Sequence, residues 1–127
     1  MLSNIDHPSI PKIIDIIKNN NIYAYILEYK SGKTIEAMIF EENHVFTPNE
    51  IYKVGIKLIN IIKYLHERSI VHRDIRVPNV IINEEEVYLI DFGLSRLVNN
   101  ERYIPSVDFY YFGHLLLHLY YSSFKKN

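Results

Sequence analysis

The most regular pattern of apolar residues lies in the middle of the chain. An apolar side chain recurs every three or four positions, at Ile51, Val54, Leu58, Ile61, Ile62 and Leu65. This spacing places them on one stripe of a helix. Just before the stripe, Thr47, Pro48 and Glu50 supply an N-cap, a first-turn proline and a capping-box acid. We therefore predict a long amphipathic helix that ends near His66.

The segment before this helix contains two apolar runs and one shorter candidate helix. KIIDIIKNNNIYAYILEY, residues 12–29, breaks at the cluster Asn19–Asn21. Tyr and Ile enrichment on either side of a polar cluster predicts two strands joined by a turn. After Gly32, KTIEAMIFEE, residues 33–42, predicts a short helix.

The segment after the long helix predicts a hairpin and a last helix. The β-branched runs VIIN, residues 80–83, and VYLI, residues 87–90, are separated by the acidic turn Glu84–Glu86. A further apolar run predicts a helix that starts near Ser106 or Val107 and ends by Tyr121. Helices combined with short hairpin strands indicate an α+β fold.

Composition narrows the class of protein. The 127 residues, 48% hydrophobic and 23% charged, fit one globular domain. A net charge of −1 gives no electrostatic reason to expect nucleic acid or a membrane as partner. The absence of cysteine excludes disulfides and thiolate chemistry. The first ten residues carry no basic segment followed by an apolar run, so we expect no signal peptide and a cytoplasmic location.

Three polar side chains lie at the ends of the predicted hairpin. Asp74 and Asn79 are five residues apart before its first strand, and Asp91 follows its second strand. Because a hairpin brings its ends together, we expect Asn79 and Asp91 to face each other. Two carboxylates and an amide can hold Mg²⁺ through oxygen while one acid stays free to accept a proton.

These residues belong to motifs that resemble those of a known family. HRDIRVPN, residues 72–79, and DFG, residues 91–93, resemble the catalytic loop and metal-binding motif of the eukaryotic-type protein kinase superfamily. HPSIPKIIDIIKNNNIYAYILEY, residues 7–29, is similar to its fourth and fifth strands and hinge. SVDFYYFG, residues 106–113, is similar to the helix start that supports the catalytic loop. Within this superfamily, the sequence as a whole resembles small bacterial serine/threonine kinase-like proteins most.

The resemblance implies a protein-kinase-like fold in a partial domain over residues 1–127. Residues 1–30 would be remnant N-lobe strands and hinge. Residues 31–127 would be an incomplete, mainly α-helical C-lobe with a catalytic-loop hairpin.

The resemblance also implies roles for individual residues. Asp74 would be the catalytic base that accepts the proton of the substrate hydroxyl, and Asn79 would hold Mg²⁺. Asp91 would chelate Mg²⁺ that bridges the phosphates of ATP. Arg76 stands where these kinases usually carry lysine, and its guanidinium would meet the γ-phosphate.

Further residues would bind the nucleotide or support the loop. Leu27 would be the gatekeeper, Glu28 and Lys30 would offer hinge backbone groups to adenine, and Ile81 would form the apolar floor of the adenine pocket. Asp108 would cap its helix and reach back to the backbone of the catalytic loop. In a separate role, His72 and Phe92 would stack in the family's regulatory spine.

The function implied is transfer of the γ-phosphoryl group of ATP to a serine or threonine of an unidentified protein, with Mg²⁺. The glycines at positions 32, 55, 93 and 113 cannot form a G-x-G-x-x-G loop, and no VAIK-like lysine is present. We therefore expect little or no transfer by these residues alone. One alternative is a kinase-derived binding or regulatory fragment, or a gene remnant. Another is a small-molecule kinase, which is less favoured because such enzymes usually carry HGD or HxD motifs and lack the R-D-I-R pattern of residues 73–76.

Overall fold

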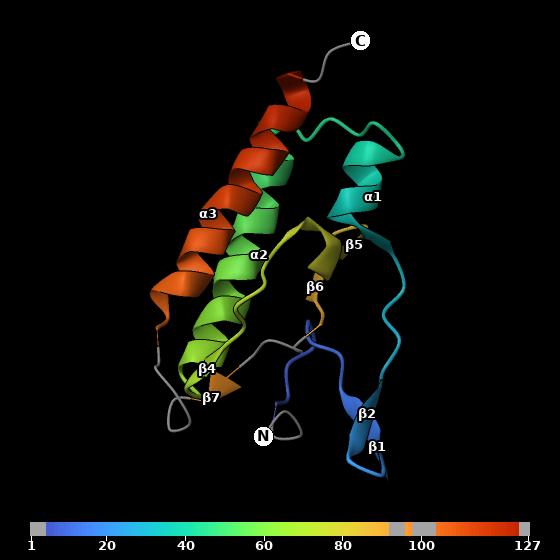
Figure 1. The fold of residues 1–127 in the computed structure, drawn as a ribbon. Helices are drawn as coiled ribbons and strands as arrows, with labels where there is room; N and C mark the ends of the chain where they lie inside the picture. The colour runs from blue at the N-terminus through green and yellow to red at the C-terminus, as the bar shows by residue number, and fades with distance from the viewer. Residues whose placement is uncertain (1–4, 92–95, 98–103, 125–127) are drawn as a thin grey trace.

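The structure is a computed structural model that describes residues 5–91, 96–97 and 104–124. Two long helices lie side by side in opposite directions, and a small helix and three small sheets surround one side of the pair (Figure 1). This mixture confirms the α+β class. The elements are β1 (Ile13–Asn19), β2 (Ile22–Leu27), β3 (Lys33–Thr34), α1 (Ile35–Phe40), α2 (Pro48–His66), β4 (Ile70–Val71), η2 (Val77–Asn79), β5 (Val80–Asn83), β6 (Glu86–Leu89), β7 (Arg96–Leu97), α3 (Ser106–Tyr121) and η3 (Ser122–Phe124).

Helix α2 is the predicted long helix, and it begins with the predicted capping box. The Thr47 side chain accepts a hydrogen bond from the Glu50 backbone N–H at 3.1 Å. In return, Glu50 Oε1 accepts one from the Thr47 backbone N–H at 2.9 Å. Both contacts satisfy amides that the first helical turn leaves unpaired. The helix ends at His66, as the apolar stripe predicts.

The core lies where the stripe of α2 meets its neighbours. Leu58, Ile62 and Leu65 are completely buried, and Leu115 and Leu119 of α3 belong to the same apolar cluster. Helix α3 is apolar on most of its surface, so Phe109, Tyr110 and Tyr120 remain exposed. None of the described helices is both long enough and apolar enough to span a bilayer.

The hairpin of β5 and β6 is confirmed, with small changes in its limits. Val80 pairs with Leu89 and Asn83 with Glu86, so the second strand begins one residue earlier than predicted. A third strand was not predicted: β3 pairs with β5 in antiparallel fashion. Thr34 ends β3 and caps α1, since its Oγ1 accepts a hydrogen bond from the Ala37 N–H at 3.0 Å. The helix is therefore shorter than the predicted range 33–42.

Strands β1 and β2 form a separate two-stranded antiparallel sheet. Asn20 and Asn21 connect them with φ angles of 48° and 72°. Two consecutive residues of positive φ make the type I′ turn that matches the twist of a hairpin, and asparagine tolerates this conformation better than most residues. The predicted turn is thus confirmed, whereas the predicted domain boundary near residue 30 stays a prediction.

The contribution of the capping box to the stability of α2 can be tested by substitution. We expect Thr47→Ala to lower the free energy of unfolding by about 1 kcal/mol, because the Glu50 amide loses its acceptor. Thr47→Ser keeps the hydroxyl and should cost clearly less. Urea denaturation followed by circular dichroism measures both. Equal losses in the two variants would show that the hydroxyl contact is not what stabilises the helix start.

Candidate functional site

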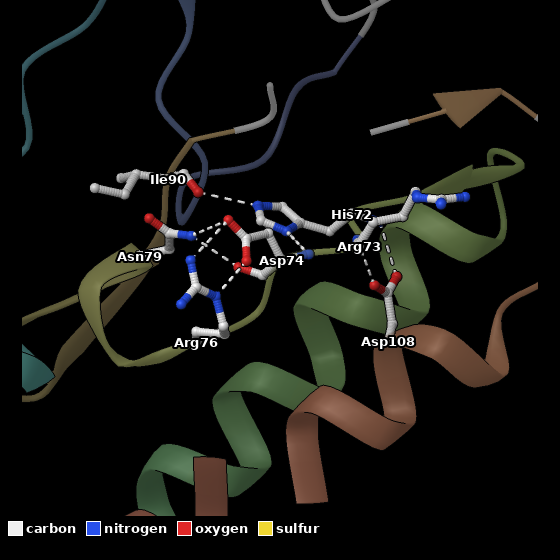
Figure 2. A network of polar contacts seen from close by, with 7 residues as sticks. All are labelled: His72, Arg73, Asp74, Arg76, Asn79, Ile90 and Asp108. Atoms are coloured by element: carbon white, nitrogen blue, oxygen red, sulfur yellow. Dashed lines mark hydrogen bonds and ion pairs between the residues drawn. The ribbon is translucent and has the colours of Figure 1, made fainter. Parts of the chain in front are cut away.

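A buried carboxylate organises the loop that follows α2. Asp108, in the first turn of α3, is completely buried. Its Oδ2 accepts a hydrogen bond from the His72 backbone N–H at 2.9 Å, and its Oδ1 accepts one from the Arg73 N–H at 2.7 Å (Figure 2). The Nε2 atom of His66, at the end of α2, lies 2.8 Å from the same Oδ2. Three polar partners compensate the removal of this carboxylate from water.

The predicted role of Asp108 is therefore partly confirmed. It reaches back to the backbone of the 72–79 loop, as expected. It does not cap its own helix, because the N-cap residue of α3 is Pro105 and no side chain there bonds the free amides. The contact with His66 was not predicted, although the position of His66 at the end of the apolar stripe places it next to this loop.

The backbone at Arg73 turns the loop toward Asp108. Arg73 has a φ of 75°, in the left-handed region that few non-glycine residues adopt. This conformation directs the N–H groups of His72 and Arg73 to one carboxylate. The cost of the unusual conformation, about 1 kcal/mol or more, is offset by hydrogen bonds to a charged acceptor, which are stronger than neutral ones.

The imidazole of His72 connects the loop to the hairpin. Its Nε2 lies 2.9 Å from the Ile90 carbonyl oxygen, and its Nδ1 accepts a hydrogen bond from the Asp74 N–H at 3.1 Å (Figure 2). Nδ1 as acceptor fixes the tautomer in which Nε2–H donates to Ile90. Burial lowers the pKa of His72, so the ring stays neutral at pH 7 and keeps both contacts.

The carboxylate of Asp74 is held by two side chains of its own loop. Arg76 Nε donates a hydrogen bond to Asp74 Oδ1. Asn79 Nδ2 donates to Asp74 Oδ2 at 3.0 Å and to the Asp74 carbonyl oxygen at 2.8 Å (Figure 2). The hydrogen bond from Arg76 is the largest cause of a pKa of Asp74 below its ordinary value. Asp74 is therefore ionised at neutral pH.

The hairpin mouth, the open end of the β5–β6 hairpin at Asn79 and Ile90, brings Asp91 close to Asp74 and Asn79. The Ile90 N–H donates to the Asn79 carbonyl oxygen at 2.9 Å, which extends the pairing of β5 and β6 by one step. Asp91 follows directly, with its side chain exposed and its φ at 62°. Its charge contributes to the pKa of His72 and opposes the effect of burial. Asp74, Asn79 and Asp91 thus come together at one end of the hairpin.

The oxygen atoms at this mouth suit a hard cation only in part. Both contacts of Asn79 in the described residues are made through Nδ2, which leaves Oδ1 without a hydrogen bond there. The exposed Asp91 adds carboxylate oxygens. Across the described residues, no three His, Asp or Glu side chains converge on one point. A Mg²⁺ ion at Asn79 and Asp91 would therefore need further ligands from phosphate and water.

The residues predicted to hold adenine come from the end of β2, the linker after it and strand β5. Leu27 ends β2 with its side chain 40% exposed. Glu28 forms an ion pair with Lys30, whose Nζ lies 3.3 Å from Glu28 Oε1. The Lys30 ammonium lies 5.0 Å from the centroid of the Tyr88 ring, and Tyr88 pairs with Ile81 across the hairpin. The linker therefore passes beside the hairpin face that carries Ile81, and the adenine-binding roles stay predictions.

Gly32 allows this close passage. Its φ is 133°, and a Cβ atom at this position would lie 2.6 Å from the Ile82 carbonyl oxygen. Only glycine fits such an approach without a shift of backbone. The predicted spine residue Phe92 lies outside the described residues.

Comparison with known proteins agrees with the motifs. The family model described as protein kinase domain matches residues 1–120. The chain is 38% identical over 130 residues to the probable serine/threonine-protein kinase YbdM of Bacillus subtilis. This alignment covers 98% of this chain and 51% of that protein. It is 34% identical over 101 residues to human serine/threonine-protein kinase Nek11, covering 77% of this chain and 16% of that protein. The chain belongs to the protein kinase family and spans about half the length of the Bacillus relative.

The contact between Arg76 and Asp74 can be tested by measuring the pKa of Asp74. We expect Arg76→Gln to raise the pKa of Asp74 toward its ordinary value of about 3.9, because the main donor is lost. Since the folded pKa lies below the unfolded one, this pair stabilises the fold above the ordinary pKa and loses its effect as pH falls. Carboxyl ¹³C titration measures the pKa. Arg68→Gln, an exposed arginine on the Tyr64 ring, is the matched control and should leave Asp74 unchanged.

Asp108 gives a second test. We expect Asp108→Asn to lower the free energy of unfolding by about 2–4 kcal/mol, because the NH2 group that replaces one carboxylate oxygen cannot accept the loop N–H that bonds this oxygen. Amide hydrogen exchange should speed up at His72 and Arg73 before it does so in the middle of α2. Unchanged exchange at these two amides would contradict the assignment of Asp108 as the group that holds the loop.

Proposed function

We propose that this member of the protein kinase family carries the proton-accepting and metal-binding part of a site that transfers the γ-phosphoryl group of ATP to a serine or threonine hydroxyl. One observation carries the proposal: an ionised Asp74 lies against Asn79 at the hairpin mouth from which Asp91 emerges. This arrangement combines an acceptor for a proton with oxygen ligands for a cation. It is the combination that phosphoryl transfer to a hydroxyl requires.

Asp74 would orient the attacking hydroxyl and accept its proton. A carboxylate with a pKa below its usual range is a weak base, so orientation is its first contribution and proton acceptance follows as the transfer advances. The contacts from Asn79 keep the carboxylate in one position. The His72 and Asp108 network fixes the backbone on which Asp74 stands.

Asn79 and Asp91 would hold Mg²⁺, which neutralises charge on the phosphates of ATP when it is bound. The Oδ1 atom of Asn79, which makes no hydrogen bond within the described residues, and the exposed carboxylate of Asp91 are oxygen ligands of the kind that this ion prefers. Mg²⁺ is usually bound by one or two protein side chains together with phosphate oxygens and water, which fits the small number of carboxylates here.

Arg76 would bind the transferred phosphoryl group. Its side chain is 54% exposed, and it contacts Asp74 through Nε and Nη2, at 3.4 Å for the latter. A guanidinium has five N–H donors, so Arg76 can bind a phosphate oxygen while it keeps one contact with Asp74. Leu27, Glu28, Lys30 and Ile81 would hold adenine at the hairpin face that carries Ile81. The protein substrate is unidentified.

A phosphotransfer assay tests the role of Asp74. With ATP, Mg²⁺ and a generic protein acceptor, we expect Asp74→Asn to lower the rate by at least about 10²-fold relative to the wild-type chain. The wild-type rate itself should be low, since the chain contains no Gly-rich loop and no strand lysine of the VAIK type. Equal residual activity in the two proteins would remove the claim that Asp74 is the base.

A binding experiment tests the metal site without requiring turnover. With a non-hydrolysable ATP analogue present, Mn²⁺ should broaden the amide signals of Asn79, Ile90 and Asp91 in a ¹⁵N spectrum, because the paramagnetic ion would lie beside them. Asp91→Asn should abolish this broadening. Asp15→Asn, on the exposed β1–β2 sheet, is the matched control and should retain it. Absence of any broadening by the wild-type chain would favour a kinase-derived binding fragment instead.

A further inference from the structure

Helix α3 has two apolar faces, and one of them stays exposed in the described part of the chain. The inner face, which includes Leu115 and Leu119, packs against α2. The outer face lies along one edge of the molecule (Figure 1). On it Tyr110, Leu117 and Tyr120 have exposed fractions of 45–63%. Because a helix that is apolar all round is usually covered all round, the outer face calls for a partner.

The outer face of α3 carries no carboxylate, ammonium or guanidinium group. From Phe109 to Phe124 the sequence contains no Asp, Glu, Lys or Arg. The exposed side of α2, in contrast, carries Lys53 and Lys63. A charged partner would lose water at such a face without gaining an opposite charge, so a second apolar surface fits it better.

The exposed side chains have the spacing of a contact between two helices. Tyr110, Gly113, Leu117 and Tyr120, which we call the outer seam, are separated by three, four and three positions. This spacing sets them on one line along the helix. All four are exposed. The spacing is the same when it is read from either end, so the outer seam can pair with a second copy of itself that runs in the opposite direction.

The sizes of the side chains fit the same pairing. In an antiparallel pair, Gly113 of each copy would face Leu117 of the other copy, and Tyr110 would face Tyr120. The space above Gly113 is open, since a Cβ atom there would meet no atom within 4 Å. Leucine opposite glycine would fill this space at both central positions. A parallel pair would instead set glycine against glycine and leave a void.

The area of the outer face is enough for a dimer of moderate stability. Five aromatic side chains on it are each about half exposed: Phe109, Tyr110, Tyr120, Tyr121 and Phe124. Because an aromatic side chain can bury about 150–250 Å², covering their exposed halves would remove roughly 500 Å² per copy from water. Two copies would bury roughly 1,000 Å², which is the lower limit for a specific interface between proteins.

We propose that the outer seam of α3 is a dimer interface, on which a second copy of this chain lies antiparallel to the first about a two-fold axis. The contact is isologous, so each copy contributes the same four residues. Because the interface is small, monomer and dimer should exchange at micromolar concentrations of the chain. No step of phosphoryl transfer depends on this contact.

Sedimentation velocity of the 127-residue chain tests the association. We expect the sedimentation coefficient to rise from that of a monomer to that of a dimer across the micromolar range. Leu117→Lys should weaken the association at least about tenfold, because it sets a charge in an apolar interface. Ile56→Lys is the matched control, since Ile56 is 46% exposed on α2 and Leu117 is 45% exposed. It should leave the association unchanged.

An exchange of the two central residues tests how the copies interlock. Gly113→Leu should weaken the dimer about tenfold, because two leucines then meet at each central position. The monomer should tolerate this change, since the space above Gly113 is open. Leu117→Ala should also weaken the dimer. The double variant Gly113→Leu, Leu117→Ala should associate more strongly than either single variant, because a small residue again faces a large one. Circular dichroism checks that every variant is folded.

Cross-linking tests the direction of the two copies. The chain contains no cysteine, so Ser106→Cys and Phe124→Cys each introduce a single thiol. In the antiparallel pair position 106 of one copy faces position 124 of the other. A short bismaleimide should therefore join the two variants when they are mixed, and should join neither variant to itself.

Four outcomes would each contradict the proposal. A monomer at every concentration would exclude the second copy and leave the outer face to a different partner. Equal effects of Leu117→Lys and Ile56→Lys would place the contact elsewhere. Additive losses in the double variant would exclude leucine against glycine. Cross-linking of Ser106→Cys to itself would show parallel copies. All four results are independent of the phosphotransfer assay.

Discussion

The carboxylate of Asp108 is the group on which the arrangement of the candidate site depends. It is fully buried, and it is acceptable there because the backbone of the 72–79 loop and His66 donate to it. The same contacts join the end of α2, the start of α3 and the loop. Without them the position of Asp74 relative to the hairpin would rest only on its contacts with His72, Arg76 and Asn79. The stability of the helix pair and the geometry of the candidate site therefore rest on the same hydrogen bonds.

The sequence predicted the long elements because their signals are strong and redundant. In helix α2 a capping box marks the start, and an apolar stripe of about five turns marks the length. The β1–β2 turn could be predicted because asparagine tolerates positive φ. The meeting of Asn79 with the end of β6 could also be predicted, since any hairpin joins its ends. The family was inferred from the resemblance of HRDIRVPN and DFG to its motifs, and the protein kinase match confirms it.

The parts that sequence analysis missed depend on contacts between distant segments. Strands β3, β4 and β7 have two residues each, too few to show a period of two. Helix α1 is shorter than predicted because Thr34 caps its start. In the sequence, one possible cap residue is a weaker signal of a helix start than a run of helix-forming residues. The contact of His66 with Asp108 joins residues 42 positions apart. The contact of Arg76 with Asp74 has no local signature either, because a guanidinium group pairs equally well with a carboxylate or a phosphate.

The left-handed backbone of Arg73 has a consequence for which residues this position can accept. The loop uses the amide of this residue and its unusual φ, both of which are properties of the main chain. A β-branched residue would be crowded in this conformation, and proline would have neither the φ nor the donor. Glycine, asparagine or an unbranched side chain would preserve the route of the chain. Sequence variation at position 73 should therefore follow backbone tolerance more closely than charge.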